Sequence, residues 1–312
     1  MPTLFLRLRS PASHDEEGYH LAVDWRIKED DGSLRAKGET DYRGLSDLID
    51  PSAQWLQDPG NVVVFVPTAN ILALNCEVPG RSSGQIKRAL PFVVEEFVAS
   101  DIESMHLAHG PIKRGEPVSV NLIDRVLLED WLACLNSLQI KPGFLIAESE
   151  LLPVTGNGAS LLLDGNSVIV RTRGQAATID RENLLLALGQ VPPGELLIFN
   201  GELSDLERGQ LEDLELRQAD VIADSAFGTL VELWNPASSA LNLLQGGYTA
   251  KRPETINFGR WRAVATLAAI WVLVALVGVV AQGFWADVQA DALETLEFFH
   301  RAGNVSNQVA DV

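Results

Sequence analysis

LLLDGNSVIVRTRGQAATI, residues 161–179, contains three short apolar stretches separated by two turn signals, Asp164-Gly165-Asn166 and Arg173-Gly174. Apolar and β-branched runs interrupted by such turns are typical of an antiparallel meander. We predict strands at 161–164, 167–172 and 175–179. A helix from Arg181 to Leu188 and an apolar strand, ELLIFN at 195–200, follow.

The same order of elements occurs once before, in the N-terminal half of the chain. We predict strands at 3–9, 20–28 and 34–40, a helix from Gly44 to Leu56, and the strand NVVVFVP at 61–67. An internal duplication therefore predicts an α/β protein with related halves, about 1–150 and 151–250. By analogy, a β-β-β-α-β half is the plan of the actin-like (RNase H-like) ATPase fold. Additional elements are predicted between the halves: a strand at 117–123 and a helix whose apolar face carries Leu127, Trp131, Leu135 and Leu138.

The motifs that bind nucleotide phosphates are missing from the sequence. Neither G-x-x-x-x-G-K-[ST] nor G-x-G-x-x-G occurs. Where an actin-like fold would place its first phosphate turn, we find Asp24-Trp25-Arg26-Ile27-Lys28, whose side chains block close approach of the backbone. Asp164-Gly165-Asn166 is interpreted as a hairpin turn. His106 and His109 have no further ligands nearby, so we predict no catalytic residue, cofactor or metal.

Composition excludes further classes of function. The net charge of -18 argues against a nucleic-acid partner, because a polyanion requires clustered basic residues. Cys76 and Cys134 are far apart and are interpreted as buried thiols in a reducing compartment. No signal peptide is predicted at the N-terminus, because Arg7 and Arg9 interrupt its apolar residues.

Residues 263–286 carry no charged side chain, and about 20 apolar residues suffice to cross a bilayer. We predict a single transmembrane helix over 263–285, marked by Ala263, Trp271, Phe284 and Trp285. The preceding linker, 251–262, is basic, and acidic residues follow the span, which predicts a cytoplasmic N-terminus. Residues 286–312 form a loose helical stripe, interpreted as a short periplasmic stalk at the start of a region beyond this chain.

RALPFVVEEF, residues 88–97, belongs to an apolar helical stripe with a proline in its middle. Pro91 costs about 3 kcal/mol inside a helix, so we predict a kink there or a helix that begins near Leu90. Glu95 and Glu96 point about 100° apart around a helix and cannot act on one atom as an acid and base pair. They are predicted to be surface acids.

Several local motifs together resemble the type II secretion system protein L family, also called general secretion pathway protein L. They are LPFVVEE at 90–96, MHLA at 105–108, Asp124-Arg125 ahead of Trp131, LLP at 151–153, and LNLLQG at 241–246 before the basic linker and the span. The resemblance covers roughly residues 1–290. LPFVVEE and NLLQG are its most specific parts.

This resemblance implies a non-enzymatic scaffold that crosses the bacterial inner membrane once, with a degenerate actin-like cytoplasmic domain. The implied partners are the secretion ATPase (protein E), held by the cytoplasmic domain, and protein M, met through the membrane and periplasmic region. A homodimer or higher assembly is also expected. For the ATPase contact we select the acidic residues close to the LPFVVEE motif: Glu95, Glu96, Asp101 and Glu103.

Two other hypotheses stay open on the residues alone. The first is a membrane-anchored actin-like protein that binds or hydrolyses a nucleotide, which measurable ATP affinity would support. The second is a single-pass receptor, although residues 286–312 are too few to form a ligand pocket.

Overall fold

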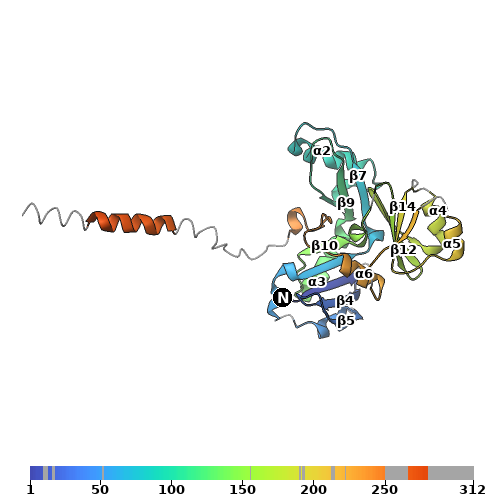
Figure 1. Ribbon diagram of the computed structural model, residues 1–312, viewed down its shortest axis with the longest axis horizontal. Helices are drawn as coiled ribbons and strands as arrows, with labels where there is room; N and C mark the ends of the chain where they lie inside the picture. Colours follow the sequence, from blue (N-terminus) through green and yellow to red (C-terminus); the bar gives the residue numbers. More distant parts are fainter. Residues whose placement is uncertain are drawn as a thin grey trace, which may run out of the picture. The chain divides into compact units, whose positions relative to one another are not determined.

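The computed structural model describes residues 1–249 and 266–279, except for short gaps at 10–12, 16–17, 51–52, 155, 190, 192–193, 212–214 and 222. Residues 1–252 form one compact unit and 253–312 another. Figure 1 shows the first unit as two sheets and a separate lobe that contains α2, β7 and β9.

The first sheet has the strand order β10-β6-β1-β4-β5. Its strands are β1 (Thr3–Leu8), β4 (Ala22–Lys28), β5 (Leu34–Asp41), β6 (Val62–Val66) and β10 (Phe144–Ala147). The first three strands form an antiparallel meander, and β6 then pairs parallel to β1. A crossover of that kind needs a connecting segment, which contains α1 (Tyr42–Leu48), capped by Asp41.

The second sheet repeats this topology with the order β13-β12-β11-β14-β15. Its strands are β11 (Ala159–Asp164), β12 (Ser167–Thr172), β13 (Gln175–Asp180), β14 (Glu195–Phe199) and β15 (Glu215–Gln218). Again three antiparallel strands precede a parallel fourth, with α4 (Leu184–Leu188) in the connection. The predicted α/β class and the predicted repeat of three strands, a helix and a strand are therefore confirmed.

The core between the sheets is built by alternation along the central strands. In β1, Phe5 faces the second sheet, while Leu4 and Leu6 face the opposite core. Phe65 of β6 packs against Phe5, with ring centroids 6.1 Å apart. Because both faces of these strands are buried, β6 is continuously apolar, and β1 is apolar from Leu4 to Leu8 except for Arg7. Helix α6 (Ala226–Leu233) also packs into this core, and α5 (Asp205–Gly209) follows β14.

A separate three-stranded sheet, in the order β7-β9-β8, forms the lobe in Figure 1. It consists of β7 (Leu72–Cys76), β8 (Met105–His109) and β9 (Val118–Asp124). Helix α3 (Arg125–Ser137) follows β9 and buries Trp131 completely in the core of the first half. A short ribbon, β2 (Ser13–Asp15) and β3 (Gly18–His20), lies between β1 and β4 in the chain.

Helix α2 (Ser83–Glu95) covers the three-stranded sheet and corrects one expectation. It begins at the Ser82 cap and runs through Pro91 to Glu95, so the prediction of a helix that begins near Leu90 was wrong. Ile86, Leu90 and Val94 are buried in the core of this lobe. Burying such side chains contributes about 1.5–3 kcal/mol each, which offsets the roughly 3 kcal/mol cost of an internal proline.

The predicted transmembrane helix is only partly covered by the described residues. Residues 266–279 are helical and exposed, and Trp271 is 73% exposed. Among the described residues, no helix combines the length and the apolar character needed to span a membrane. Ala263, Phe284 and Trp285 lie outside the described residues, as do the linker at 251–262 and the stalk at 286–312. The span therefore stays a prediction.

Candidate functional site

The two turns considered for phosphate binding differ in outcome. Asp24 to Lys28 lie inside strand β4 and not in a turn. The prediction that these residues occupy the position of the first phosphate turn was therefore wrong. The actual connection from β1 to β4 contains the β2–β3 ribbon. At the second site the hairpin interpretation is correct: Asp164 pairs with Ser167, and Gly165 has a φ of +61°. Glycine adopts that φ without strain in a two-residue hairpin turn.

Buried charges occupy the space between the two halves, next to this second turn. Arg7 of β1 donates from Nε to Glu148 Oε1 at 2.5 Å, and its Nη2 lies 2.8 Å from Asp164 Oδ2. Glu148 also accepts from the backbone N–H of Thr68 at 3.3 Å. Arg7 and Glu148 side chains are 7% and 4% exposed. One guanidinium therefore connects β1, the 3-10 turn at Glu148–Leu151, and the β11–β12 hairpin.

Burial shifts the pKa values of the charged groups in this network. Desolvation raises the pKa of Glu148, and Arg7 opposes that shift. The pKa of Arg7 is raised because the two carboxylates outweigh its own burial. Asp24 has a raised pKa because it is buried, although Arg9 donates to both of its oxygens at 2.9 and 2.8 Å. Each of these carboxylates is therefore paired with an arginine. Moreover, the described part of the chain contains no group of three His, Cys, Asp or Glu residues able to hold a metal.

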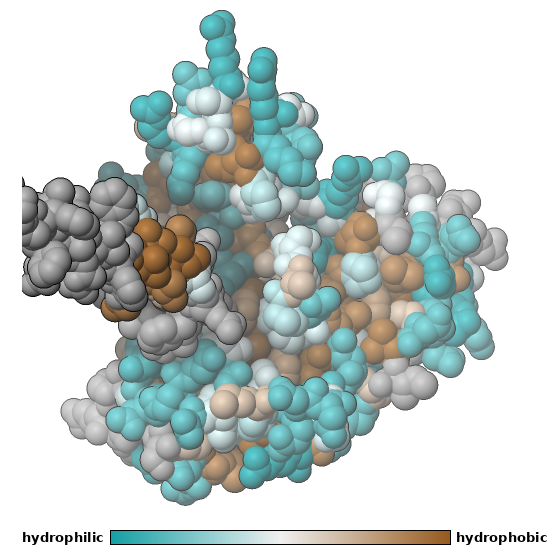
Figure 2. Space-filling view, turned by 60° about the vertical axis from the view of Figure 1, so that its left-hand side comes forward, coloured by the Kyte–Doolittle hydropathy of each residue, from teal (hydrophilic) through white to brown (hydrophobic). Residues whose placement is uncertain are grey.

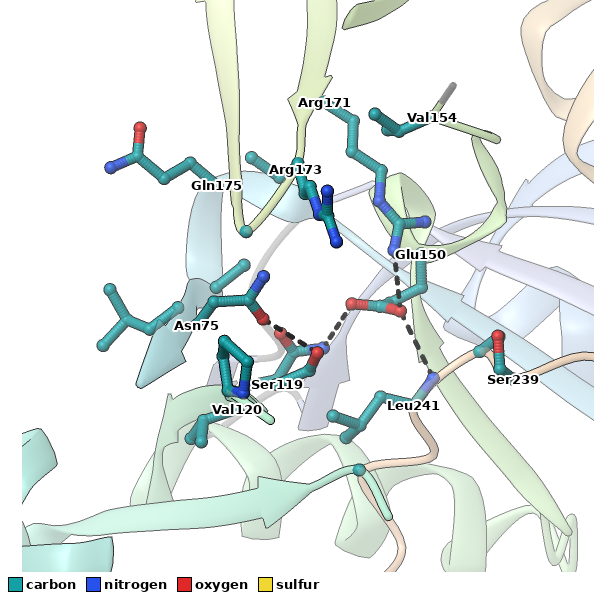
Figure 3. A pocket seen from close by; sticks show the side chains of 18 of the residues that line it. Asn75, Ser119, Val120, Glu150, Val154, Arg171, Arg173, Gln175, Ser239 and Leu241 are labelled. Atoms are coloured by element: carbon teal, nitrogen blue, oxygen red, sulfur yellow. Dashed lines mark hydrogen bonds and ion pairs between the residues drawn. The ribbon is translucent and has the colours of Figure 1, made fainter. Parts of the chain in front are cut away.

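A cleft of about 760 Å³ lies between the three-stranded sheet and the β12–β13 hairpin. Glu150 lies in this cleft beside Arg171 and Leu241 (Figure 3). It accepts from Asn121 Nδ2 at 3.1 Å, from Arg171 Nη2 at 3.2 Å, and from the Leu241 N–H at 3.4 Å. Glu150 and Arg171 are therefore both occupied by structural contacts. Arg173, at the hairpin tip, also points toward the cleft. The cleft has room for a ligand, but its two best-placed charges neutralise each other.

The LNLLQG segment, residues 241–246, forms a strap across the first half. Asn242 Oδ1 accepts from the N–H groups of Leu145 and Leu244, and its Nδ2 donates to Gly143 O. The Gln245 side chain exchanges two hydrogen bonds with the backbone of His109, at 3.2 and 3.0 Å. The side-chain amides of Asn242 and Gln245 thus bond to backbone groups, as a neighbouring strand would. They attach residues 241–246 to the first half of the chain.

His106 is part of the same attachment. It is buried, its Nε2 lies 2.6 Å from Leu243 O, and its ring meets the edge of Tyr248. Burial lowers the pKa of His106, and because a carbonyl oxygen can only accept, Nε2 is the donor to Leu243 O. Both MHLA and LNLLQG therefore have a packing role.

The four residues predicted for the ATPase contact are all exposed. Glu95 and Glu96 lie at the C-terminal end of α2. Asp101 caps the 3-10 turn Ile102–Ser104, where it accepts from the Glu103 N–H at 2.9 Å. Helix α2 contacts this turn, so the two acidic pairs lie on one end of the lobe. Figure 2 shows hydrophilic residues over much of the visible face.

Sequence reasoning missed the charged residues that join the halves. In the sequence, Arg7 only marks the interruption of an apolar N-terminus, and nothing near Glu148 distinguishes it from other acids. A charged residue inside the apolar strand TLFLRL is the one local signal that a buried ion pair was needed.

Phe97, expected on the apolar stripe of residues 88–97, is 56% exposed, because helix α2 ends before it.

Comparison with known proteins identifies relatives. The family model for type II secretion system protein L matches residues 7–251. The protein L of Pseudomonas aeruginosa is 24% identical over 67% of this chain and 51% of the relative, and that of Vibrio cholerae is 27% identical over 75% and 58%. The chain thus spans between half and three fifths of the length of these two relatives.

A solved structure supports the fold. The cytoplasmic domain of EpsL, described as an inner membrane component of the type II secretion system of Vibrio cholerae, superposes with a TM-score of 0.60. The two are 20% identical, and the match covers 80% of this chain and all of that domain. The resemblance predicted from the LPFVVEE and NLLQG motifs is confirmed by the family match.

Proposed function

We propose that this chain, which belongs to the type II secretion system protein L family, is a non-enzymatic inner-membrane scaffold. In this role it recruits the cytoplasmic secretion ATPase, protein E, to the membrane platform and links it to protein M for export of folded proteins. The observation that carries the proposal is the family match over residues 7–251.

The fold and the site support a scaffold rather than a hydrolase. The repeated topology of the two sheets agrees with an actin-like plan. Yet the region beside the β11–β12 hairpin is filled by the Arg7, Glu148 and Asp164 network. A phosphate there would meet two carboxylates and would have to displace them from their arginine, which is electrostatically costly. We therefore expect residues 1–250 not to bind ATP at micromolar concentrations, and calorimetry tests this.

The membrane part of the proposal rests on the sequence. The uncharged run at 263–286, the basic linker before it and the acids after it support a single span with the N-terminus in the cytoplasm. A reporter fused after Val312 is expected to be periplasmic, and one fused at Gly246 cytoplasmic. Cytoplasmic activity from both fusions would contradict this topology.

The ATPase contact is proposed to include the acidic end of the lobe. Residues 1–250 hold 19 basic and 36 acidic residues, a net charge of -17, which would steer a basic surface of the ATPase toward them. Steering acts on the association rate, so added salt should slow association more than it speeds dissociation.

Membrane recruitment of the ATPase tests this contact. The variants Glu95→Lys/Glu96→Lys and Asp101→Lys/Glu103→Lys each reverse two negative charges, at two neighbouring sites. As a matched control, Glu182→Lys/Asp205→Lys makes the same change on exposed residues of the second half. We expect reduced recruitment for at least one of the first two variants and unchanged recruitment for the control. Equal recruitment by all three, at normal abundance, would place the contact elsewhere.

A further inference from the structure

The cleft of about 760 Å³ lies against the face of the three-stranded sheet that helix α2 does not cover. Side chains alternate between the two faces of β7 and β9. Cys76 and Val118 belong to the core under α2. Asn75 and Ser119, which pair across the two strands, lie on the opposite face and line the cleft. The floor of the cleft is therefore polar.

Two sets of contacts hold the walls of the cleft at a fixed spacing. At the tip of the β12–β13 hairpin, a Cβ added to Gly174 would lie 2.6 Å from Asn75 Nδ2, so the turn packs directly against β7. Elsewhere in the cleft, Glu150 accepts hydrogen bonds from Asn121 of β9 and from Arg171 of β12. The cleft is thus formed in the free protein, as is usual for binding sites.

The lining of the cleft is basic, although the unit around it is acidic. Its charged residues are Lys113, Glu116, Glu150, Arg171 and Arg173. Three basic and two acidic side chains give a net charge of +1, whereas residues 1–250 carry -17. Glu150 pairs with Arg171 at 3.2 Å, and Glu116 pairs with Lys113 at 3.3 Å. Within the described residues, Arg173 is left without an ion pair.

Arg173 is placed to meet an anion that enters the cleft. It is exposed, it is the first residue of the two-residue turn between β12 and β13, and it points toward the cleft (Figure 3). Asn75 supplies a second donor. Ser119 Oγ donates to Asn75 Oδ1 at 2.8 Å, which leaves the Asn75 amide N–H groups without an acceptor among the described residues.

These donors fit a carboxylate better than a phosphate. A guanidinium binds a carboxylate through two parallel hydrogen bonds, and one cation neutralises its single charge. A phosphate group carries close to two negative charges at pH 7, which one free arginine does not balance. Moreover, none of the described residues that line the cleft is aromatic, so no side chain there offers a surface on which a nucleobase could stack.

We propose that the cleft binds an extended, acidic segment of another protein. A carboxylate of this segment pairs with Arg173 and accepts from Asn75, while its backbone follows the polar floor of the cleft. The volume of about 760 Å³ accepts several residues of a peptide, because sites for drug-sized ligands measure about 300–1,000 Å³.

This site goes beyond the proposed scaffold function and differs from the ATPase contact in its charge. The contact at Asp101 and Glu103 would attract a basic surface, whereas the cleft would attract an acidic segment. The two sites also lie on different elements, since Arg173 belongs to the hairpin of the second sheet. Each can therefore be removed without changing a residue of the other.

Photo-cross-linking in cells provides the first test. Benzoylphenylalanine in place of Ser239, which is exposed and lines the cleft, would mark the occupant of the cleft on the full chain. Glu182, which is exposed and lies outside the lining, is the matched control position. We expect a protein adduct at position 239 and not at position 182, attached close to an Asp or Glu by mass spectrometry. No adduct above the control, or an adduct with a second copy of this chain, would overturn the proposal.

Substitution of Arg173 tests the role of its charge. Arg173→Glu should lower the adduct yield on the order of tenfold, because an attraction becomes a repulsion. Arg173→Lys keeps the charge but loses the planar fork, so its loss should be smaller. Arg81→Glu changes an exposed arginine outside the cleft and should have no effect. An unchanged yield in Arg173→Glu, or an equal loss in Arg173→Lys, would contradict the proposed pairing.

The segment identified by mass spectrometry gives a second measurement, which needs no variant of this chain. A synthetic peptide of that sequence, and the same peptide with its acid replaced by the corresponding amide, are titrated against the full chain in detergent by fluorescence anisotropy. The amide peptide should bind on the order of tenfold more weakly, since it no longer carries the charge that faces Arg173. Equal affinities would overturn the proposal.

Recruitment of the ATPase separates this proposal from the proposed function. Arg173→Glu should leave recruitment unchanged while the adduct is lost, and Asp101→Lys/Glu103→Lys should leave the adduct unchanged. If the adduct fails to form although recruitment depends on Asp101 and Glu103, the cleft proposal is wrong and the scaffold function stands. If recruitment ignores those acids although the adduct depends on Arg173, the cleft proposal stands alone.

Discussion

Replacing Arg7 by alanine should destabilise residues 1–250 strongly, because it isolates a buried carboxylate. The substitution removes both the 2.5 Å contact to Glu148 and the 2.8 Å contact to Asp164. Glu148 would keep only the Thr68 N–H at 3.3 Å. Removing one partner of a buried ion pair typically costs about 3–5 kcal/mol. At 2–4 °C per kcal/mol for a unit of this size, the melting temperature should fall by roughly 6–20 °C.

The pH dependence of this deficit identifies its cause. Burial already raises the pKa of Glu148, and loss of the guanidinium would raise it further. A carboxyl group whose pKa is raised on folding favours the folded state when protonated and disfavours it once ionised. The deficit of Arg7→Ala should therefore be largest near neutral pH and shrink as the pH falls and Glu148 takes up a proton.

Thermal and urea unfolding of purified 1–250, followed by tryptophan fluorescence, would measure the effect. The control is Arg35→Ala, which breaks an exposed 3.5 Å pair with Glu29 and should cost less than about 1 kcal/mol. Arg7→Met/Glu148→Gln removes the isolated charge and should be more stable than Arg7→Met. A folded Arg7→Ala protein within about 1 kcal/mol of wild type at pH 7 would refute the reasoning, as would a deficit that grows on acidification.

Three further substitutions test other parts of the fold by the same unfolding measurements. Glu207→Ala removes the capping box of α5 and the 3.1 and 3.0 Å bonds from Arg181, and should cost about 1–3 kcal/mol at pH 7. Because Arg181 and Ser204 lower the pKa of Glu207 from 4.5 to about 2, its contribution is complete above pH 4.5, and the deficit should vanish as the pH falls through 2. Asn242→Ala deletes three hydrogen bonds, two of which attach the strap to Gly143 and Leu145, and should cost about 2–3 kcal/mol, whereas no change would show that the contacts of Gln245 and Leu243 suffice. Gly174→Ala should cost about 1 kcal/mol or more, because Gly174 has a φ of +99° and a Cβ would lie 2.6 Å from Asn75 Nδ2, while Gly84→Ala in open space on α2 should be neutral or stabilising.

Local pattern was sufficient to predict the two sheets. Strands β11, β12 and β13 follow the three apolar stretches within two residues, and β6 and β14 coincide with the apolar runs at 61–67 and 195–200. Both halves could be recognised because each contains its own turns and its own apolar period. Strands β7, β8, β10 and β15 were not predicted. They are short, and β7 and β10 also pair with strands that lie far away in the sequence, β9 and β6.

The sequence by itself determined the α/β class, the internal repeat, the family and the lack of a nucleotide-binding motif, because each depends on residues close together in the chain. Only the tertiary structure decided that α2 continues through Pro91, since the compensating burial of Leu90 and Val94 is against β-strands from elsewhere. The same holds for the ion pair of Arg7 with Glu148, whose members are 141 residues apart in the sequence. Burial turns such a pair from a marginal surface contact into a strong constraint, and burial is a property of the folded chain alone.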